Sequence, residues 1–82
     1  MLVNDIIVDK EKTSENIRCL MKKNGHTVGQ LVELTGLTKN TISNYRNGHN
    51  VPNMHNLGVI AKVYGVDIDE IIVYKTKDEK ND

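Results

Sequence analysis

Apolar residues recur along this chain at the three- and four-residue intervals that place side chains on one face of an α-helix. A glycine ends each apolar segment, and glycine adopts the left-handed backbone that closes many helices without Cβ strain. The pattern therefore predicts a series of short helices. The apolar faces and their closing glycines are Ile17, Leu20 and Met21 before Gly25; Val28, Leu31 and Val32 before Gly36; Ile42 and Tyr45 before Gly48; and Leu57, Ile60, Ala61 and Tyr64 before Gly65.

Residues that cap helix N-termini open the same segments. Thr27 and Gln30 have the spacing of a capping box, in which hydroxyl and amide satisfy reciprocal backbone N–H groups, and Asp67 with a glutamate three residues later repeats it. Thr38 and Asn53 are also favourable caps. Starts and ends together predict five helices, near residues 13–24, 28–35, 39–47, 54–64 and 67–73.

The two ends of the chain allow two interpretations. Residues 3–8 and 71–74 both contain the triplet Ile-Ile-Val, and β-branched runs favour strands. Either these segments pair as a short two-stranded ribbon, or Ile71 and Ile72 complete the last helix while the N-terminal arm stays loose. The final KTKDEKND has no apolar residue, which is typical of a solvated tail. We therefore expect an N-terminal arm or strand over residues 1–12, a folded domain over 13–74 and a flexible charged tail over 75–82.

The length of 82 residues corresponds to one small domain with a modest core, and the expected fold class is all-α, a compact domain of five helices. No apolar run approaches the roughly 18 residues of a membrane-spanning helix, and the N-terminus lacks the pattern of a secretory signal. The expected location is the cytoplasm, without membrane contact. Cys19 is the only cysteine, so no internal disulfide forms, and we expect a packed thiol.

The net charge is zero, but its distribution is uneven. Between residues 10 and 55 the chain carries seven lysines and arginines against only three glutamates. The compensating acids lie toward the two ends, at Asp5, Asp9, Asp67, Asp69, Glu70, Asp78, Glu79 and Asp82. A neutral total therefore hides a basic middle, which favours a polyanionic partner there.

The basic middle contains TKNTISNYRNGHNVPN, residues 38–53, which has no acidic residue and few bulky apolar ones. The preceding Gly36-Leu37-Thr38 is short enough to force the second and third helices into a steep crossing, a helix-turn-helix. In such a unit the second helix enters the DNA major groove and must keep a wide polar face. Here Ile42 and Tyr45 occupy one narrow side and leave the rest of the helix free.

These features together resemble the Cro and phage-repressor family of helix-turn-helix DNA-binding domains, also called the lambda-repressor-like or XRE family. The resemblance covers most of the chain, from NIRCLMKKNGHT through LVELTGLTKNTISNYRNG to VPNMHNLGVIAKVYGVDIDEII. It implies the five-helix fold of that family and double-stranded DNA as the partner. The matching residues are Leu31, Gly36, Leu37, Thr38, Ile42, Ser43, Asn47, Gly48, Pro52, Leu57, Ala61, Gly65 and Val66.

The resemblance also assigns roles to residues. The family's base-reading positions fall on Lys39, Asn40 and Asn44, with Thr41 and Ser43 nearby. Lysine can donate to guanine O6 or N7, and asparagine can form a bidentate pair with adenine. The phosphate-contacting positions are Asn47 and the following His49 and Asn50, together with the starts of the helices, where N–H groups face solvent. These starts carry Thr27, Gln30, Thr38 and Asn53.

Three departures from the family pattern affect this assignment. Val28 stands where the family commonly has a phosphate-binding glutamine, so Thr27 and Gln30 replace that contact only in part. Val32 stands where a small alanine is common, which predicts slightly wider spacing of the crossing helices. Met21 and Arg46 replace an Arg–Glu ion pair of many relatives, which frees Arg46 for phosphate.

Two function classes follow. The first is a sequence-specific transcriptional regulator, a repressor, bound to DNA as a homodimer across two half-sites. The second is a protein-interaction module of the same fold, an antitoxin or antirepressor, using Leu34, Val59 and any edge strand near Ile72. We expect no enzyme, because the chain has no phosphate-binding glycine loop and no paired carboxylates at a cleft. His26, His49 and His55 lack metal-ligand spacing, so no metal, cofactor or small-molecule ligand is expected.

Overall fold

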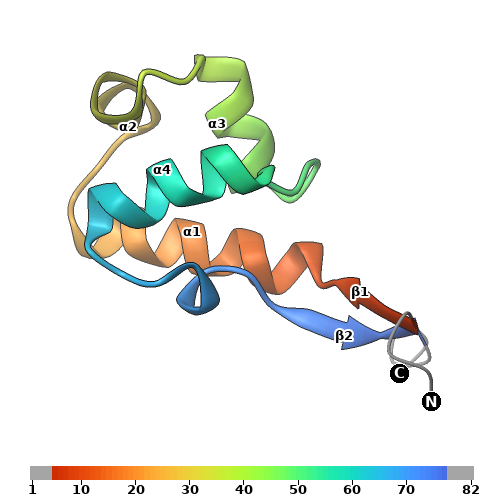
Figure 1. The fold of residues 1–82 in the computed structure, drawn as a ribbon. Coiled ribbons are helices and arrows are strands. Elements are labelled where there is room, and N and C mark those ends of the chain that lie inside the picture. The colour runs from red at the N-terminus through yellow and green to blue at the C-terminus, as the bar shows by residue number, and fades with distance from the viewer. Residues whose placement is uncertain (1–4, 78–82) are drawn as a thin grey trace.

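The computed structural model describes residues 5–77, which form four α-helices and a two-stranded antiparallel ribbon. The helices surround one core, and the ribbon extends from one end of the molecule (Figure 1). In chain order the elements are β1 (Ile6–Val8), α1 (Lys10–Lys23), α2 (Val28–Thr35), α3 (Lys39–Arg46), α4 (Met54–Tyr64), a 3₁₀ turn (Ile68–Glu70) and β2 (Tyr74–Thr76).

The predicted helix starts at Thr27, Thr38 and Asn53 are confirmed. Each of these side chains accepts a hydrogen bond from the backbone N–H three residues later. The first helix differs, because Asp9 accepts from the N–H of Lys12 at 3.0 Å and α1 therefore begins at Lys10 instead of near residue 13. Local capping chemistry thus sets the start of every α-helix in the described residues.

The core contains the predicted apolar faces. Ile17, Leu31, Ile42 and Ile60 are each at most 1% exposed and come from α1, α2, α3 and α4 respectively. One expectation about α1 is wrong: Cys19 is exposed and not packed. The reason is its position on the helix, since Ile17 and Met21 face the core and Cys19, midway between them, points to the opposite side.

The predicted fifth helix is not confirmed, because residues 68–70 make only one 3₁₀ turn. The backbone groups that would continue a helix bond instead to distant parts of the chain. Asp9 N–H donates to the Val73 carbonyl at 2.7 Å, and Asn16 Nδ2 donates to the Ile71 carbonyl at 2.9 Å. Ile71 is fully buried in the core. The fold is therefore a small, compact helical domain with four α-helices and a short two-stranded antiparallel sheet in the described residues.

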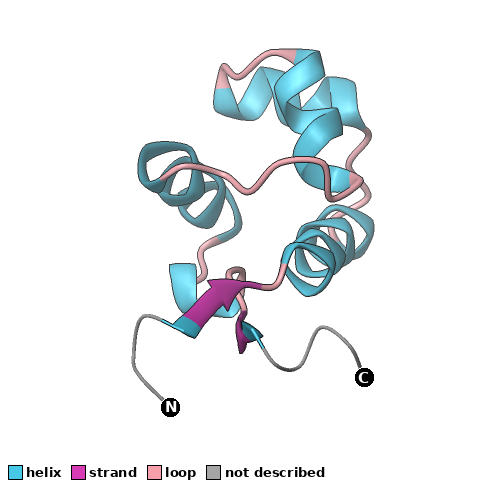
Figure 2. Ribbon diagram, turned by 90° about the vertical axis from the view of Figure 1, so that its right-hand side faces the viewer, coloured by secondary structure: helices cyan, strands magenta, loops and turns pink. Residues whose placement is uncertain are grey.

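The ribbon is the alternative that the structure adopts for the chain ends. Ile6, Ile7 and Val8 pair with Thr76, Lys75 and Tyr74, so β2 lies later than the predicted segment 71–74. The two strands lie together below the helices (Figure 2). Residues 3 and 4 of the predicted N-terminal strand and residues 78–82 of the predicted tail lie outside the described residues.

Helices α2 and α3 cross steeply, as a helix-turn-helix requires: α2 is seen nearly end-on where α3 runs lengthwise (Figure 1). Gly36 makes the turn possible, because its φ of 77° lies in the left-handed region and its N–H donates to the Val32 carbonyl at 2.8 Å. Leu37 packs against the core from the same turn. The turn thereby fixes how α3 is presented to solvent.

Candidate nucleic-acid interface

One side of α3 anchors the helix and the other side is polar. Ile42 and Tyr45 are 1% and 6% exposed, and the Tyr45 hydroxyl accepts a hydrogen bond from Asn56 Nδ2 of α4 at 2.8 Å. This bond satisfies a phenol that would otherwise be buried without a partner. Because the anchors lie three residues apart, the opposite face of α3 makes no contribution to the core.

Several of the predicted base-reading and phosphate residues lie together beside this polar face. Asn40, Thr41 and Asn44 of α3 border one shallow depression with Asn50 and Asn53 of the following loop. Lys10, at the first turn of α1, lines the same depression. Amide groups, a hydroxyl and an ammonium group therefore converge from three segments, and no carboxylate lines this depression.

The capping interactions decide which donors these residues retain. Thr38 Oγ1 accepts from Thr41 N–H at 3.1 Å and donates to Thr41 Oγ1 at 2.8 Å, so Thr41 keeps the free hydroxyl proton. Asn53 Oδ1 accepts from Asn56 N–H at 2.8 Å, which leaves the Nδ2 group to donate outward. Thr41 and Asn53 thus offer donors, whereas the Thr38 hydroxyl is used within the fold.

The loop after α3 is tied back to the helix. The backbone N–H groups of His49 and Asn50 both donate to the Asn44 carbonyl, at 2.9 and 3.3 Å. These two amides are therefore engaged, and the exposed side chains of His49 and Asn50 are what the loop presents. The bonds also fix the loop relative to Asn44 at the centre of the polar face.

The N-terminus of α2 forms the predicted capping box. Gln30 N–H donates to Thr27 Oγ1 at 3.2 Å, and Thr27 N–H donates to Gln30 Oε1 at 2.7 Å. Both side chains are exposed, and the Gln30 Nε2 group remains available as a donor next to the helix start. Val28 at this position is apolar and half-buried against the core.

Arg46 lies apart from the polar depression. Its side chain borders a second depression with Arg18 and Lys22 of α1, while Met21 of the same helix α1 is buried in the core. Arg18 Nη1 donates to the Arg46 carbonyl at 2.8 Å and thereby fastens the end of α3 to α1. Sequence reasoning missed Arg18 and Lys22 because they lie more than 20 residues before Arg46.

Three predicted residues border the interface without joining the polar depression. Lys39 is exposed at the first turn of α3, Ser43 is half-buried, and Asn47 is exposed and lines a small hollow against the N-terminal half of α1. The cation Lys10 was also missed, since its only sequence signal was the general excess of basic residues in that part of the chain.

His26 and Tyr64 meet close to the start of α2. His26 Nδ1 lies 3.0 Å from the Tyr64 hydroxyl, and the two ring centroids are 5.5 Å apart. Burial disfavours the charged phenolate and raises the pKa of Tyr64 above its ordinary value of 10.0. The hydroxyl therefore stays protonated at neutral pH.

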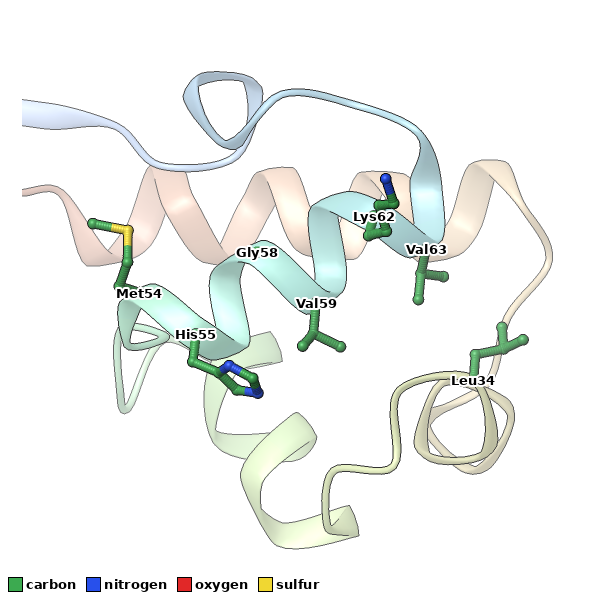
Figure 3. Close-up of a pocket in the computed structure, with 7 residues that line it drawn as sticks. All are labelled: Leu34, Met54, His55, Gly58, Val59, Lys62 and Val63. Atoms are coloured by element: carbon green, nitrogen blue, oxygen red, sulfur yellow. The ribbon is translucent and has the colours of Figure 1, made fainter.

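A different surface, an apolar groove, lies between α2 and α4 (Figure 3). Leu34 and Met54 are 51% and 75% exposed at its two ends, and Val59 is half-buried between them. His55 and Lys62 border the groove. This is the surface on which Leu34 and Val59 were predicted to meet a protein partner, whereas Ile72 is half-buried and precedes the strand β2.

Comparison with known families identifies this arrangement. A family model described as a Cro/C1-type HTH DNA-binding domain matches residues 16–77, which is well over half of the chain. No match was found among the curated proteins or among the solved structures. None of the helices in the described residues is both long and apolar enough to cross a membrane.

Proposed function

Since the chain belongs to the Cro/C1-type helix-turn-helix DNA-binding family, we propose that it is a sequence-specific transcriptional repressor that reads double-stranded DNA with α3. The observation that carries the proposal is the division of α3 into a buried side, Ile42 and Tyr45, and a polar side of amides, hydroxyls and cations. Carboxylates, which phosphate would repel, are absent from residues 38–53.

In the proposed complex the N-terminal half of α3 enters the major groove. Lys39, Asn40 and Asn44 contact base edges, with Thr41 and Ser43 beside them. Phosphates on either side are held by the start of α2 and by the segment from the end of α3 to α4. The phosphate residues are Thr27, Gln30, Thr38, Arg46, Asn47, His49, Asn50 and Asn53. Because the Thr38 hydroxyl is used within the fold, Thr38 would contribute its backbone N–H.

A single short helix makes few base contacts, so we propose that two copies bind two half-sites about one helical turn apart. The DNA itself then aligns the two copies. A palindromic preference in the selected DNA is the expected signature of this arrangement.

The decisive experiment is selection of binding sequences from randomised duplexes, followed by affinity measurement at two or more salt concentrations. We expect a defined, pseudo-palindromic preference and an affinity that falls steeply with salt, because each neutralised phosphate releases counterions. Failure to enrich any sequence, with no duplex binding even at low salt, would contradict the proposal.

A protein-interaction module is the second candidate, and the exposed Leu34 and Met54 of the apolar groove favour it. The same measurements separate the two functions. An antitoxin or antirepressor acting through the groove would lose partner binding on Leu34→Glu while its salt dependence on DNA stayed flat. A repressor would keep its DNA affinity in that variant, since Leu34 lies in the groove on α2 and α4, which shares no lining residue with the polar depression.

A further inference from the structure

A concentrated group of basic side chains lies between α1 and the end of α3. The depression there is lined by Arg18, Lys22 and Arg46, with Glu15 as its one carboxylate. His26 and Cys19 complete the lining. Three permanent cations against one acid give the site a net charge of about +2 with neutral histidine, which suits an anion.

Arg18 is held in place before any ligand binds. Its Nη1 donates to the Arg46 carbonyl at 2.8 Å and to Ser14 Oγ at 3.2 Å. Ser14 is only 3% exposed and is itself fixed, because its hydroxyl donates to the Glu11 carbonyl at 2.9 Å. Both contacts of the guanidinium use Nη1, so within the described residues Nε and Nη2 remain available to an oxygen anion.

The position of the depression connects two parts of the proposed DNA interface. His26 immediately precedes Thr27, the cap of α2, and Arg46 immediately precedes Asn47 at the end of α3. Lys22 and Arg18 lie on the last two turns of α1 and fill the interval between these ends. These cations therefore lie between the proposed phosphate contacts at the start of α2 and those at the end of α3.

We propose that this depression binds one phosphate of the DNA backbone through Lys22, Arg18 and Arg46. The inference rests on the proposed function and adds to it a contact from α1. It joins Arg18 and Lys22, which lie on α1 outside the helix-turn-helix, to Arg46 at the end of α3. Met21 of α1 is buried in the core, whereas Arg18 and Lys22 are exposed and line the depression.

The first test removes one charge from the depression without touching the fold. Lys22 is exposed and caps nothing, so Lys22→Gln is compared with Lys62→Gln, an equal charge change on α4. Arg18 is left intact because it fastens α3. Fluorescence anisotropy with a random-sequence duplex gives affinity against salt. We expect Lys22→Gln to reduce the slope of log affinity on log salt by about 0.9, the value for one phosphate contact, and Lys62→Gln to leave it unchanged.

The second test uses Cys19, the single thiol of the chain, which lies in the depression and is exposed. A bound phosphate and its neighbouring sugars would cover it. We expect N-ethylmaleimide to alkylate Cys19 more slowly as duplex is added, in step with the fraction of protein bound. A matched control places the thiol at an exposed position on α4, as Lys62→Cys with Cys19→Ser, and its alkylation should not change.

The outcomes distinguish the two proposals. If the wild-type chain binds duplex DNA while Lys22→Gln keeps the full salt slope and Cys19 stays reactive in the complex, the phosphate site is wrong and the proposed function stands. If the wild-type chain binds no duplex, the proposed function and the site are both overturned. A reduced slope together with protected Cys19 supports the site.

Discussion

At the scale of single residues, the polar side chains in and around α3 differ in whether they already make hydrogen bonds within the fold. The side chains of Thr38 and Asn53, the N-caps of α3 and α4, make capping hydrogen bonds. The side-chain amides of Asn40 and Asn44 make no hydrogen bond within the described residues and border the open depression. A free carboxamide presents a donor and an acceptor side by side, which is the pattern that adenine matches.

The first prediction concerns Asn44. Asn44→Ala should relax the preference at one or two base pairs of the selected sequence and cost about 1–3 kcal/mol on that sequence, because a bidentate contact is lost. Competition binding with single-base variants of the selected duplex measures both effects.

Asn47→Ala provides the matched control, since it makes the same change at a proposed phosphate contact. It should weaken all duplexes alike and keep the sequence preference. If Asn44→Ala also weakened preferred and random duplexes by the same factor, Asn44 would not read bases.

At the scale of elements, the presentation of α3 depends on the turn at Gly36. Gly36→Val should destabilise the protein by about 2 kcal/mol or more, because a β-branched residue resists the φ of 77° observed there. Thermal unfolding monitored by circular dichroism measures the loss. A Cβ at Gly36 meets no atom within 4 Å, so the effect isolates the backbone conformation.

Gly58 in α4 offers the opposite case. A Cβ added there also meets nothing within 4 Å, and the residue is inside a regular helix. Gly58→Ala should therefore stabilise the protein by about 0.5–1 kcal/mol.

Equal unfolding temperatures for Gly36→Val and the wild-type protein would refute the assigned turn.

The sequence predicts an element well when the interactions that form it join residues close together in the chain. The bounds of α2, α3 and α4 were predicted within a residue, since their caps and apolar periodicity are local. The start of α1 and the segment after α4 were not. Thr13, chosen as the start of the first helix, lies inside α1 and accepts instead from Val73 N–H, 60 residues away. No local pattern encodes such a bond.

The same distinction applies to the candidate site. The residues of α3 and the caps of α2 and α4 could be proposed from the sequence because they lie in a contiguous motif whose order is itself a signal. Lys10, Arg18 and Lys22 join the surface only when α1 packs beside α3, so their contribution required the tertiary structure. Which surface the Arg46 side chain lines also depends on that packing.

At the scale of the whole molecule, hydrogen bonds from α1 hold residues 71–73, which precede β2, against the helices. Thr13, 2% exposed, accepts from Val73 N–H at 3.0 Å directly before the ribbon. Thr13→Val keeps the side-chain shape but leaves that N–H without a partner, so we expect a loss of about 1–3 kcal/mol in the free energy of unfolding.

Chemical denaturation measures this loss, and Thr13→Ser, which retains the hydroxyl, should recover most of it. Protection of the amides of residues 73–76 from hydrogen exchange should fall in Thr13→Val more than that of α3. A uniform loss of protection over all helices would instead mean that the ribbon and the helices unfold together.

Stability at alkaline pH is a property of the whole fold, and it depends in part on the ionisation of one half-buried phenol, that of Tyr64. The pKa of Tyr64 is raised by burial, so the folded protein keeps the phenolic proton at pH values where the unfolded chain has lost it. Below about pH 10 both states are protonated and Tyr64 adds no pH dependence. As the pH rises from there through the raised pKa, the unfolded state is favoured and stability falls.

Tyr64→Phe removes this ionisation, so its stability should decline less steeply above about pH 10 than that of the wild-type protein. Chemical denaturation in a series of alkaline buffers gives the free energy of unfolding of both proteins against pH. The slopes of the two curves are compared, because loss of the contact with His26 lowers the stability of Tyr64→Phe at every pH. Tyr74→Phe removes an equivalent hydroxyl from a side chain that is 59% exposed, and its curve should run parallel to the wild type. Parallel slopes for Tyr64→Phe as well would show that burial of the phenol does not couple folding to its ionisation.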